Sequence, residues 1–302
     1  MRAVVTGGAG FIGSHVVEAL LARGDEATVV DNFATGKRKN VPSAATLVEH
    51  DIREPFDVAA EVVFHLAAQA DVRVSVDDPA LDAHVNVVGT LRVLEAARRA
   101  GATVVFASTG GAIYGECERP AREDDDRLPL APYGTAKLAA EEYLATYNRL
   151  YRTEHVALRY GNVFGPRQDP HGEAGVVAIF LGRLAEGSPL KIFGDGSQTR
   201  DYVYVGDVAR ATLSAGGAGG GVFNVGTGRE TSVLELAQLC GGAAGVEPEL
   251  VHAPPRAGEI GRSVLETALA EREFGFRAET SLEDGLHATW RWLAGDGAGD
   301  AK

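Results

Sequence analysis

The feature that most constrains this fold is a glycine-rich turn directly after the first apolar run. The run Ala3–Thr6 reads as a β-strand, and residues 6–13 (T-G-G-A-G-F-I-G) then open a helical pattern. Gly7 suits a tight turn, Gly10 lets backbone N–H groups approach a pyrophosphate, and Gly13 lets the helix pack on the strand. This order of strand, turn and helix predicts a dinucleotide-binding site rather than a purely structural turn.

The acidic residue Asp31 predicts which dinucleotide is bound. It closes the second predicted strand, 18 residues after Gly13. A carboxylate there accepts hydrogen bonds from the adenosine ribose hydroxyls and repels a 2′-phosphate, which favours NAD over NADP. Lys37 and Arg38 weaken this argument, because either cation could attract a phosphate.

Further cofactor-binding candidates flank the turn or follow strand ends. Asp51 is expected to hold the adenine edge or to form an ordinary turn, and Asn86 to brace the pocket or to cap a helix. Small residues after the fourth strand would let the cofactor pass close by. The full set comprises Phe11, Ile12, Asn32, Gly36, Asp51, Ile52, Leu66, Ala67, Ala68, Gln69 and Asn86.

Apolar runs alternate with helical patterns through the first half of the chain, which predicts a Rossmann-type, doubly wound parallel sheet. We expect an NAD-binding domain over residues 1–161, with a segment near 203–228 returning to it. A smaller α/β substrate-binding lobe is expected over residues 162–302. The predicted strands are Ala3–Thr6, Ala27–Val30, Thr46–Glu49, Val62–Leu66, Thr103–Ser108, His155–Arg159, Leu190–Phe193, Tyr202–Val205 and Val222–Val225. The predicted helices are Ile12–Ala22, Val87–Ala100, Gly134–Tyr151, Val176–Glu186 and Val233–Leu239.

A tyrosine and a lysine four residues apart predict proton transfer. Tyr133 and Lys137 share one helical face. The ammonium, like a positive nicotinamide ring, favours the phenolate, which can exchange a proton with a sugar hydroxyl while hydride passes to or from the cofactor. Ser108 or Thr109, at the end of the fifth strand, is expected to supply a hydroxyl that shares the proton, and either could instead cap a turn.

Together these residues resemble the extended short-chain dehydrogenase/reductase superfamily and, within it, the UDP-glucose 4-epimerase family over nearly the whole chain. The resemblance rests on residues 6–15 (T-G-G-A-G-F-I-G-S-H), 65–69 (H-L-A-A-Q), 108–115 (S-T-G-G-A-I-Y-G), 133–137 (Y-G-T-A-K), 158–170 (L-R-Y-G-N-V-F-G-P-R-Q-D-P), 194–208 (G-D-G-S-Q-T-R-D-Y-V-Y-V-G-D-V) and 223–228 (F-N-V-G-T-G). It implies tightly bound NAD, removal of the 4-hydroxyl proton by Tyr133, and inversion of C4 through a transient 4-keto intermediate.

The resemblance also implies the other binding residues. Tyr160 and Val163 match positions beside the nicotinamide, and Asn162 matches a diphosphate-binding asparagine. The positions implied for the UDP-sugar are Thr109, Tyr133, Asn162, Val176, Val177, Lys191, Ile192, Phe193, Arg200, Tyr202, Arg256 and Glu259. The family is usually a homodimer, joined through helices near residues 85–100 and 134–150.

The identity of the sugar stays open at this stage. Gly261 stands where the family often has arginine, and Ser263 leaves room for a 2-acetamido group. UDP-glucose and UDP-galactose are expected, with UDP-N-acetylglucosamine or UDP-glucuronate as alternatives. A glucuronate carboxylate would need extra donors, for which Arg73, Ser75 and Arg167 are candidates.

Four other functions are alternatives to an epimerase. A 4,6-dehydratase would need acids where Gly110 and Gly111 stand. A UDP-glucuronate decarboxylase and another sugar-nucleotide oxidoreductase remain alternatives. A redox-sensing binding protein of this fold would not need Tyr133, Lys137 and Thr109.

Composition excludes several classes of partner. The formal net charge of −13 and the lack of a strongly basic patch argue against nucleic acid, and no apolar run reaches the ~20 residues that span a membrane. The histidines lack metal-ligand spacing, so no metal is expected. Cys117 and Cys240 lack disulfide-type spacing, and no signal peptide is visible, so we expect a soluble cytoplasmic protein.

Overall fold

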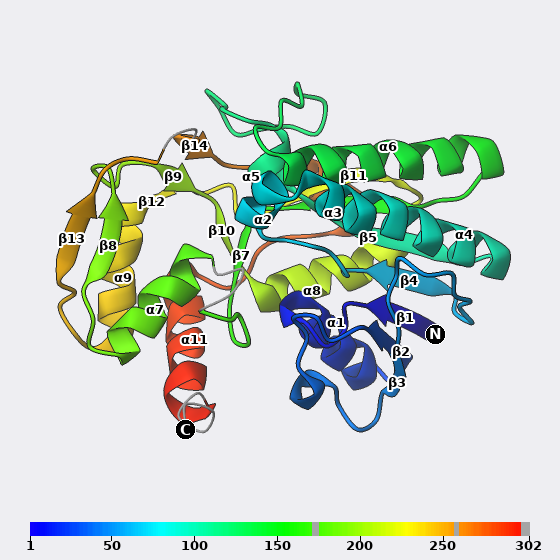
Figure 1. Ribbon diagram of the computed structural model, residues 1–302, viewed down its shortest axis with the longest axis horizontal. Coiled ribbons are helices and arrows are strands. Elements are labelled where there is room, and N and C mark those ends of the chain that lie inside the picture. The colour runs from blue at the N-terminus through cyan, green and yellow to red at the C-terminus, as the bar shows by residue number, and fades with distance from the viewer. Residues whose placement is uncertain (171–174, 257–259, 297–302) are drawn as a thin grey trace.

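The computed structural model describes residues 1–170, 175–256 and 260–296 and has at its centre a parallel sheet of seven strands (Figure 1). The strand order is β11-β6-β5-β4-β1-β2-β3. These strands are β1 (Arg2–Thr6), β2 (Glu26–Asp31), β3 (Thr46–Glu49), β4 (Val62–His65), β5 (Thr103–Thr109), β6 (Val156–Tyr160) and β11 (Gly221–Val225). The predicted doubly wound α/β fold is confirmed.

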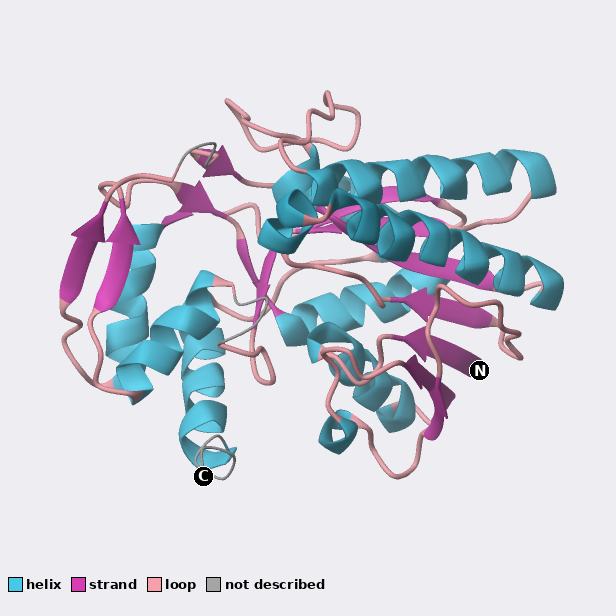
Figure 2. Ribbon diagram, viewed as in Figure 1, coloured by secondary structure: helices cyan, strands magenta, loops and turns pink. Residues whose placement is uncertain are grey.

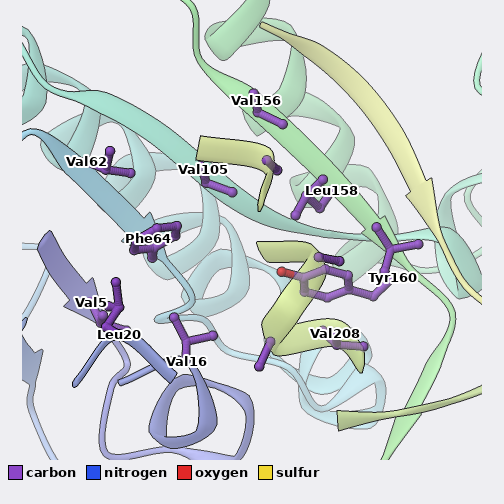
Figure 3. Close-up of a cluster of buried hydrophobic side chains, with 14 of the residues drawn as sticks. Val5, Val16, Leu20, Val62, Phe64, Val105, Val156, Leu158, Tyr160 and Val208 are labelled. Atoms are coloured by element: carbon purple, nitrogen blue, oxygen red, sulfur yellow. The ribbon is translucent and has the colours of Figure 1, made fainter. Parts of the chain in front are cut away.

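Helices cover both faces of this sheet (Figure 2). On one face, α1 (Phe11–Ala22) and α8 (Val205–Ser214) pack on the sheet through Val16, Leu20 and Val208 (Figure 3). On the other, α4 (Thr90–Ala100) and α6 (Pro132–Tyr151) contribute Leu94 and Leu144 to a second core. Burial on both faces explains why the central strands are continuous apolar runs.

Several shorter elements that the sequence patterns did not predict join the sheet to its helices. Between β4 and α4 lie α2 (Val72–Asp77), α3 (Pro79–Ala83) and a π-helical stretch, His84–Gly89. The helix expected to begin at residue 87 therefore continues a turn that begins earlier. The remaining short elements are the 3₁₀ turns Arg38–Asn40 and Ala215–Gly217, and α5 (Gly110–Ile113).

A smaller half of the molecule stands beside the carboxyl ends of the sheet strands (Figure 1). Three helices pack together in it: α7 (Val176–Ala185), α9 (Val233–Ala244) and α11 (Leu282–Asp296). Its small sheets pair β8 (Leu190–Phe193) with β13 (Leu250–Ala253), β7 (Asn162–Phe164) with β10 (Tyr202–Tyr204), and β9 (Thr199–Arg200) with β12 (Thr231–Ser232) and β14 (Arg262–Ser263). Phe180, Leu236 and Leu286 belong to its core.

The chain crosses between the halves more than once. After β10, α8 packs against α1, and β11 then pairs with β6 at the edge of the large sheet. The helix α10 (Ala268–Phe274) also contacts β11. The expected strand over residues 202–205 stops at Tyr204 because Val205 begins α8, whose apolar face is buried against the sheet.

Candidate active site

The glycine turn after β1 has the geometry of a phosphate cradle. Gly7 has φ +70°, and a Cβ there would lie 2.6 Å from the Ala67 nitrogen. A Cβ on Gly13 would lie 2.1 Å from the Gly7 carbonyl oxygen, so α1 can approach the turn only without a side chain. A Cβ on Gly10 would come within 4 Å of the Gly7 oxygen alone. The turn therefore presents backbone at the N-terminus of α1, which suits a pyrophosphate.

A cleft of about 460 Å³ runs from this turn along the carboxyl ends of the sheet strands. It brings together every predicted cofactor-binding residue except Asn86. These lining residues are Gly7, Gly10, Phe11, Ile12, Gly13, Asp31, Asn32, Gly36, Asp51, Ile52, Leu66, Ala67, Ala68, Gln69, Ser108, Tyr133, Lys137, Tyr160 and Val163. The set and its shape fit an extended dinucleotide.

The structure adds lining residues that the sequence analysis missed. Several are neighbours of predicted positions, such as Ala34, Arg53 and Ala107, and a wider window around each motif would have included them. Leu81, Val85 and Gln168 come from α3, the π-helical stretch and the loop after β7. No motif marks them, since only the packing of these segments brings them to the cleft.

Asn86 lies behind the cleft wall and holds it in place. Its side-chain oxygen accepts from the Gln69 nitrogen (3.0 Å), and its amide donates to the Gln69 carbonyl (2.8 Å) and to Asp82 (2.9 Å). Asn86 is buried, and both hydrogen bonds to Gln69 fix the backbone of a lining residue. Of the two expectations for Asn86, the brace matches these contacts.

Charges at the end of the cleft beside β2 are arranged around Asp31. Its carboxylate accepts from the nitrogens of Ala9 (2.9 Å) and Phe33 (2.8 Å), which fixes its orientation at the end of β2. The nearby cations have acidic partners: Lys37 lies 3.5 Å from Asp169, and Arg38 pairs with Glu49. These pairs reduce the attraction that the basic cluster would exert on a 2′-phosphate.

The predicted proton-transfer pair lies on the first two turns of α6. Lys137 is buried, and its Nζ donates to the carbonyl oxygen of Ala107 (2.9 Å). The same Nζ lies 5.9 Å from the centre of the Tyr133 ring. A cation held this close favours the phenolate form of a tyrosine. The cleft therefore holds a fixed cation beside the ring of its helical neighbour Tyr133.

The two candidate hydroxyls at the end of β5 are placed differently. Ser108 lines the cleft and is buried, and its Oγ donates to Glu141 (2.5 Å). Thr109 lies one residue further, where β5 ends and α5 begins, and is not among the cleft-lining residues.

The two glycines after Thr109, where a dehydratase would need acids, differ in the room they leave for a side chain. A Cβ on Gly110 would lie 2.6 Å from the side chain of Leu265, so any side chain there would displace the buried leucine. A Cβ on Gly111 would face the side-chain oxygen of Asn162 at 3.5 Å.

The residues expected to bind the UDP-sugar fall into three groups. Val177, Ile192 and Tyr202 are buried members of the core of the smaller half. Arg256 and Lys191 lie against the ring of Phe193, at 3.9 Å and 4.9 Å from its centre. Val176, Asn162 and Arg200 are partly exposed. Glu259 lies outside the described residues. Thr109 and Tyr133 also belong to this set, and among its described members Tyr133 alone lines the cleft.

The three donors considered for a glucuronate carboxylate already have partners. Arg73 pairs with Asp71 (2.6 Å), and Ser75 is buried with its hydroxyl on the Val72 carbonyl (2.7 Å). Arg167 pairs with Glu18. Using any of them for a substrate carboxylate would require breaking these contacts.

The described residues hold neither a metal-binding cluster nor a membrane-spanning helix. No group of histidine, cysteine, aspartate or glutamate side chains there could hold a metal ion. None of the helices in the described ranges combines the length and apolar character needed to cross a membrane.

Comparison with known proteins places this geometry in a wider group. A model of the NAD dependent epimerase/dehydratase family matches residues 3–226. A UDP-glucose 4-epimerase of Mycolicibacterium smegmatis is 47% identical over 304 residues, covering 96% of this chain and 97% of that protein.

Two solved structures are also similar. The UDP-glucose 4-epimerase of Thermotoga maritima with UDP-glucose is 45% identical, with a TM-score of 0.93 and coverage of 97% of this chain and 99% of that one. The UDP-glucose 4-epimerase of Thermus thermophilus in complex with NAD is 47% identical, with a TM-score of 0.91 and coverage of 98% and 99%.

Proposed function

Since this chain belongs to the NAD dependent epimerase/dehydratase family, we propose that it is an NAD-dependent UDP-hexose 4-epimerase, with UDP-glucose and UDP-galactose as its substrates. The observation that carries the proposal is the pair Tyr133 and Lys137 in the dinucleotide cleft, in a chain whose relatives at 45–47% identity are UDP-glucose 4-epimerases. The resemblance found in the sequence is confirmed at the level of the family.

Bound NAD supplies the hydride acceptor and donor for C4 of the sugar. The chain's own residues hold the reactants and move the proton. Gly7, Gly10 and Gly13 give backbone access to the pyrophosphate, and Asp31 accepts from the ribose hydroxyls. Tyr133 takes the proton of the 4-hydroxyl and returns it after the 4-keto sugar has presented its other face. Lys137 keeps Tyr133 in the form that can accept this proton.

The nucleotide is proposed to bind at polar and aromatic members of the predicted set. Asn162 is proposed to bind the diphosphate, and Arg200 and Arg256 to bind the diphosphate and uridine ribose, because a planar guanidinium donates two hydrogen bonds at once. Phe193 is proposed to border the uracil, and Glu259 to bind the ribose. Asn162 and Arg200 are partly exposed and Arg256 is exposed, so a nucleotide could reach these three side chains, which supports the assignment.

The small side chain of Ser263 suggests a second candidate substrate. Ser263 pairs with Arg200 between β14 and β9 and is a small residue at the position where bulk would exclude a 2-acetamido group. UDP-N-acetylglucosamine is therefore the second candidate substrate. UDP-glucuronate is less suited, since Arg73, Ser75 and Arg167 are engaged elsewhere.

We also propose a homodimer joined through α4 and α6. Tyr143, Leu150 and Tyr151 of α6 are large side chains with 41%, 64% and 44% of their area exposed, which is surface that a partner helix could cover. Cys117 and Cys240 are free, which suits the reducing conditions of the proposed cytoplasmic location.

The test incubates purified protein with UDP-glucose, UDP-N-acetylglucosamine and UDP-glucuronate separately, without added NAD, and separates products by chromatography. We expect the C4 epimer of UDP-glucose. Release of CO₂, or formation of a deoxy sugar, would overturn the proposal.

A variant then tests the role of the tyrosine. Tyr133→Phe should lose nearly all turnover while still binding UDP-glucose, whereas Tyr204→Phe, outside both the cleft and the proposed interface helices, should behave as wild type. Unchanged turnover in Tyr133→Phe would remove Tyr133 from the mechanism.

A further inference from the structure

The face of α6 that carries Tyr133 and Lys137 also carries a carboxylate, that of Glu141, one turn further along the helix. Tyr133, Lys137 and Glu141 follow at intervals of four residues, so their side chains form one stripe along the helix. Two of them hold consecutive residues of β5. Lys137 Nζ donates to the Ala107 carbonyl (2.9 Å), and Glu141 accepts from the Ser108 hydroxyl (2.5 Å).

Glu141 is also half of a buried ion pair. Arg159 of β6, which lies opposite Ser108 in the sheet register, donates from Nη2 to Glu141 Oε2 at 2.7 Å and from Nε to Oε1 at 3.0 Å. Their side chains are 1% and 2% exposed. Nη1 of Arg159 donates to the Tyr114 hydroxyl (2.7 Å), which donates to Asn224 of β11 (2.7 Å). A single network thus joins α6, β5, β6 and β11.

The chemistry of this network settles the direction of the Ser108 hydrogen bond. An arginine side chain stays charged in proteins, and a carboxylate that pairs with it can only accept hydrogen bonds. The Ser108 hydroxyl must therefore give its single proton to Glu141. Because Ser108 also lines the cleft, the side it presents to a ligand carries lone pairs and no proton.

We propose that Glu141 is a positioning residue that commits the Ser108 proton to the protein interior and so makes Ser108 a hydrogen-bond acceptor in the cleft. Ser108 then receives an N–H or O–H of the bound cofactor or sugar. This inference rests on the proposed function, because it assigns roles within the same site.

The first experiment measures kcat and KM for UDP-glucose epimerisation in Glu141→Gln, Ser108→Ala and the double variant. A glutamine keeps the size of Glu141 but can donate to Ser108, which reverses the hydrogen bond. We expect kcat to fall on the order of 10- to 100-fold, as for other residues that orient a reacting group, with KM within about threefold. In the Ser108→Ala background the same substitution should change kcat by less than about threefold.

Glu142→Gln is the matched control. Glu142 is the next residue of α6, and its exposed carboxylate pairs with Arg127, so we expect wild-type kinetics. Melting temperatures of all variants separate a loss of turnover from a loss of folded protein. If Glu141→Gln does not fold, the neutral pair Glu141→Gln/Arg159→Gln, which buries no unpaired charge, takes its place in both backgrounds.

The outcomes are distinct. An effect of Glu141→Gln on kcat that disappears when Ser108 is alanine supports the inference. An effect of equal size in both backgrounds, or no effect on kcat, overturns it. Full activity of Glu141→Gln together with an inactive Tyr133→Phe would overturn this inference alone and leave the proposed epimerase standing.

Discussion

The cleft and the smaller half of the molecule differ in which atoms would contact a ligand. The cleft is shaped by backbone: Gly7, Gly10 and Gly13 exclude side chains. In the smaller half, recognition is proposed to depend on side chains such as Arg256, which stacks on Phe193. The cleft gathered its predicted residues almost completely, whereas the predicted nucleotide-binding residues divide between a hydrophobic core and partly exposed positions. A site formed by backbone requires glycines at a fixed spacing in the sequence. A site formed by side chains from several segments has no such fixed spacing.

The largest expected effect comes from adding one methyl group to a glycine in the cleft and, for comparison, to a glycine in the smaller half. Gly13→Ala would place a Cβ 2.1 Å from the Gly7 carbonyl oxygen, and no flexible side chain can yield there. We expect a loss of about 3 kcal/mol or more in the free energy of unfolding, together with loss of bound NAD, measured by denaturant titration and by nucleotide content.

Gly242→Ala is its counterpart in α9 of the smaller half, where no atom lies within 4 Å of the added Cβ. This helical position should gain about 0.5–1 kcal/mol. Equal losses in both variants would contradict the idea that backbone packing distinguishes the cleft.

The second prediction concerns the pH dependence of stability and His65, at the end of β4. Burial, and then the charge of Lys137, lowers the pKa of this imidazole from 6.5 to about 3. The unfolded chain therefore takes up a proton near pH 6.5, while the folded protein does not until near pH 3. The contribution of His65 is complete above pH 6.5 and is lost as the pH falls through this window.

We expect His65 to account for about 2 kcal/mol of the stability lost between pH 7 and pH 5. Denaturant titrations at several pH values should show a flatter profile for His65→Gln. His252→Gln, at an exposed histidine of the smaller half, should keep the wild-type slope. A profile for His65→Gln that runs parallel to the wild type would assign the acid sensitivity to other groups.

The third prediction tests the proposed role of Asp31 in the preference for NAD over NADP. Asp31→Asn keeps the size of Asp31 but loses the charge, so NAD affinity should fall on the order of 10- to 100-fold while the preference against NADP shrinks. Fluorescence titration of cofactor-free protein with each nucleotide measures both. Asp25→Asn, directly before β2, should leave both affinities unchanged, and an unaltered NAD preference in Asp31→Asn would place selectivity elsewhere.

The smallest expected effect lies in the UDP-sugar half. Phe193→Ala removes the ring under Arg256 and Lys191, and a partly exposed cation–π contact is worth about 0.5–1 kcal/mol. KM for UDP-glucose should rise about two- to fivefold with kcat unchanged. Val251→Ala, an exposed position on the paired strand β13, should change neither constant. A fall in kcat for Phe193→Ala would mean that this side chain acts on the reacting sugar.

Much of the cleft was predictable because its parts are local in sequence. The turn at Gly7, the strand end at Asp31 and the pair Tyr133 and Lys137 each occupy a short segment with one plausible geometry. Leu81, Val85 and Gln168 were missed because their place in the cleft depends on how α3, the π-helical stretch and the loop after β7 pack. Helix α8 was missed because the apolar run over residues 202–205 predicts a strand that continues into Val205, the first residue of this helix.

The sequence by itself determined the doubly wound sheet, the glycine turn after the first strand and the placing of Tyr133 and Lys137 on one helical face, since these depend on periodicity and on spacing within single elements. Only the tertiary structure decided how groups from different strands and helices meet. It brought Arg159 beside Glu141 and turned the Ser108 proton away from the cleft, and it engaged Arg73, Ser75 and Arg167 with other partners. The physical reason is that a hydrogen bond or ion pair depends on distances of a few ångströms, which are set by packing between segments far apart in the chain.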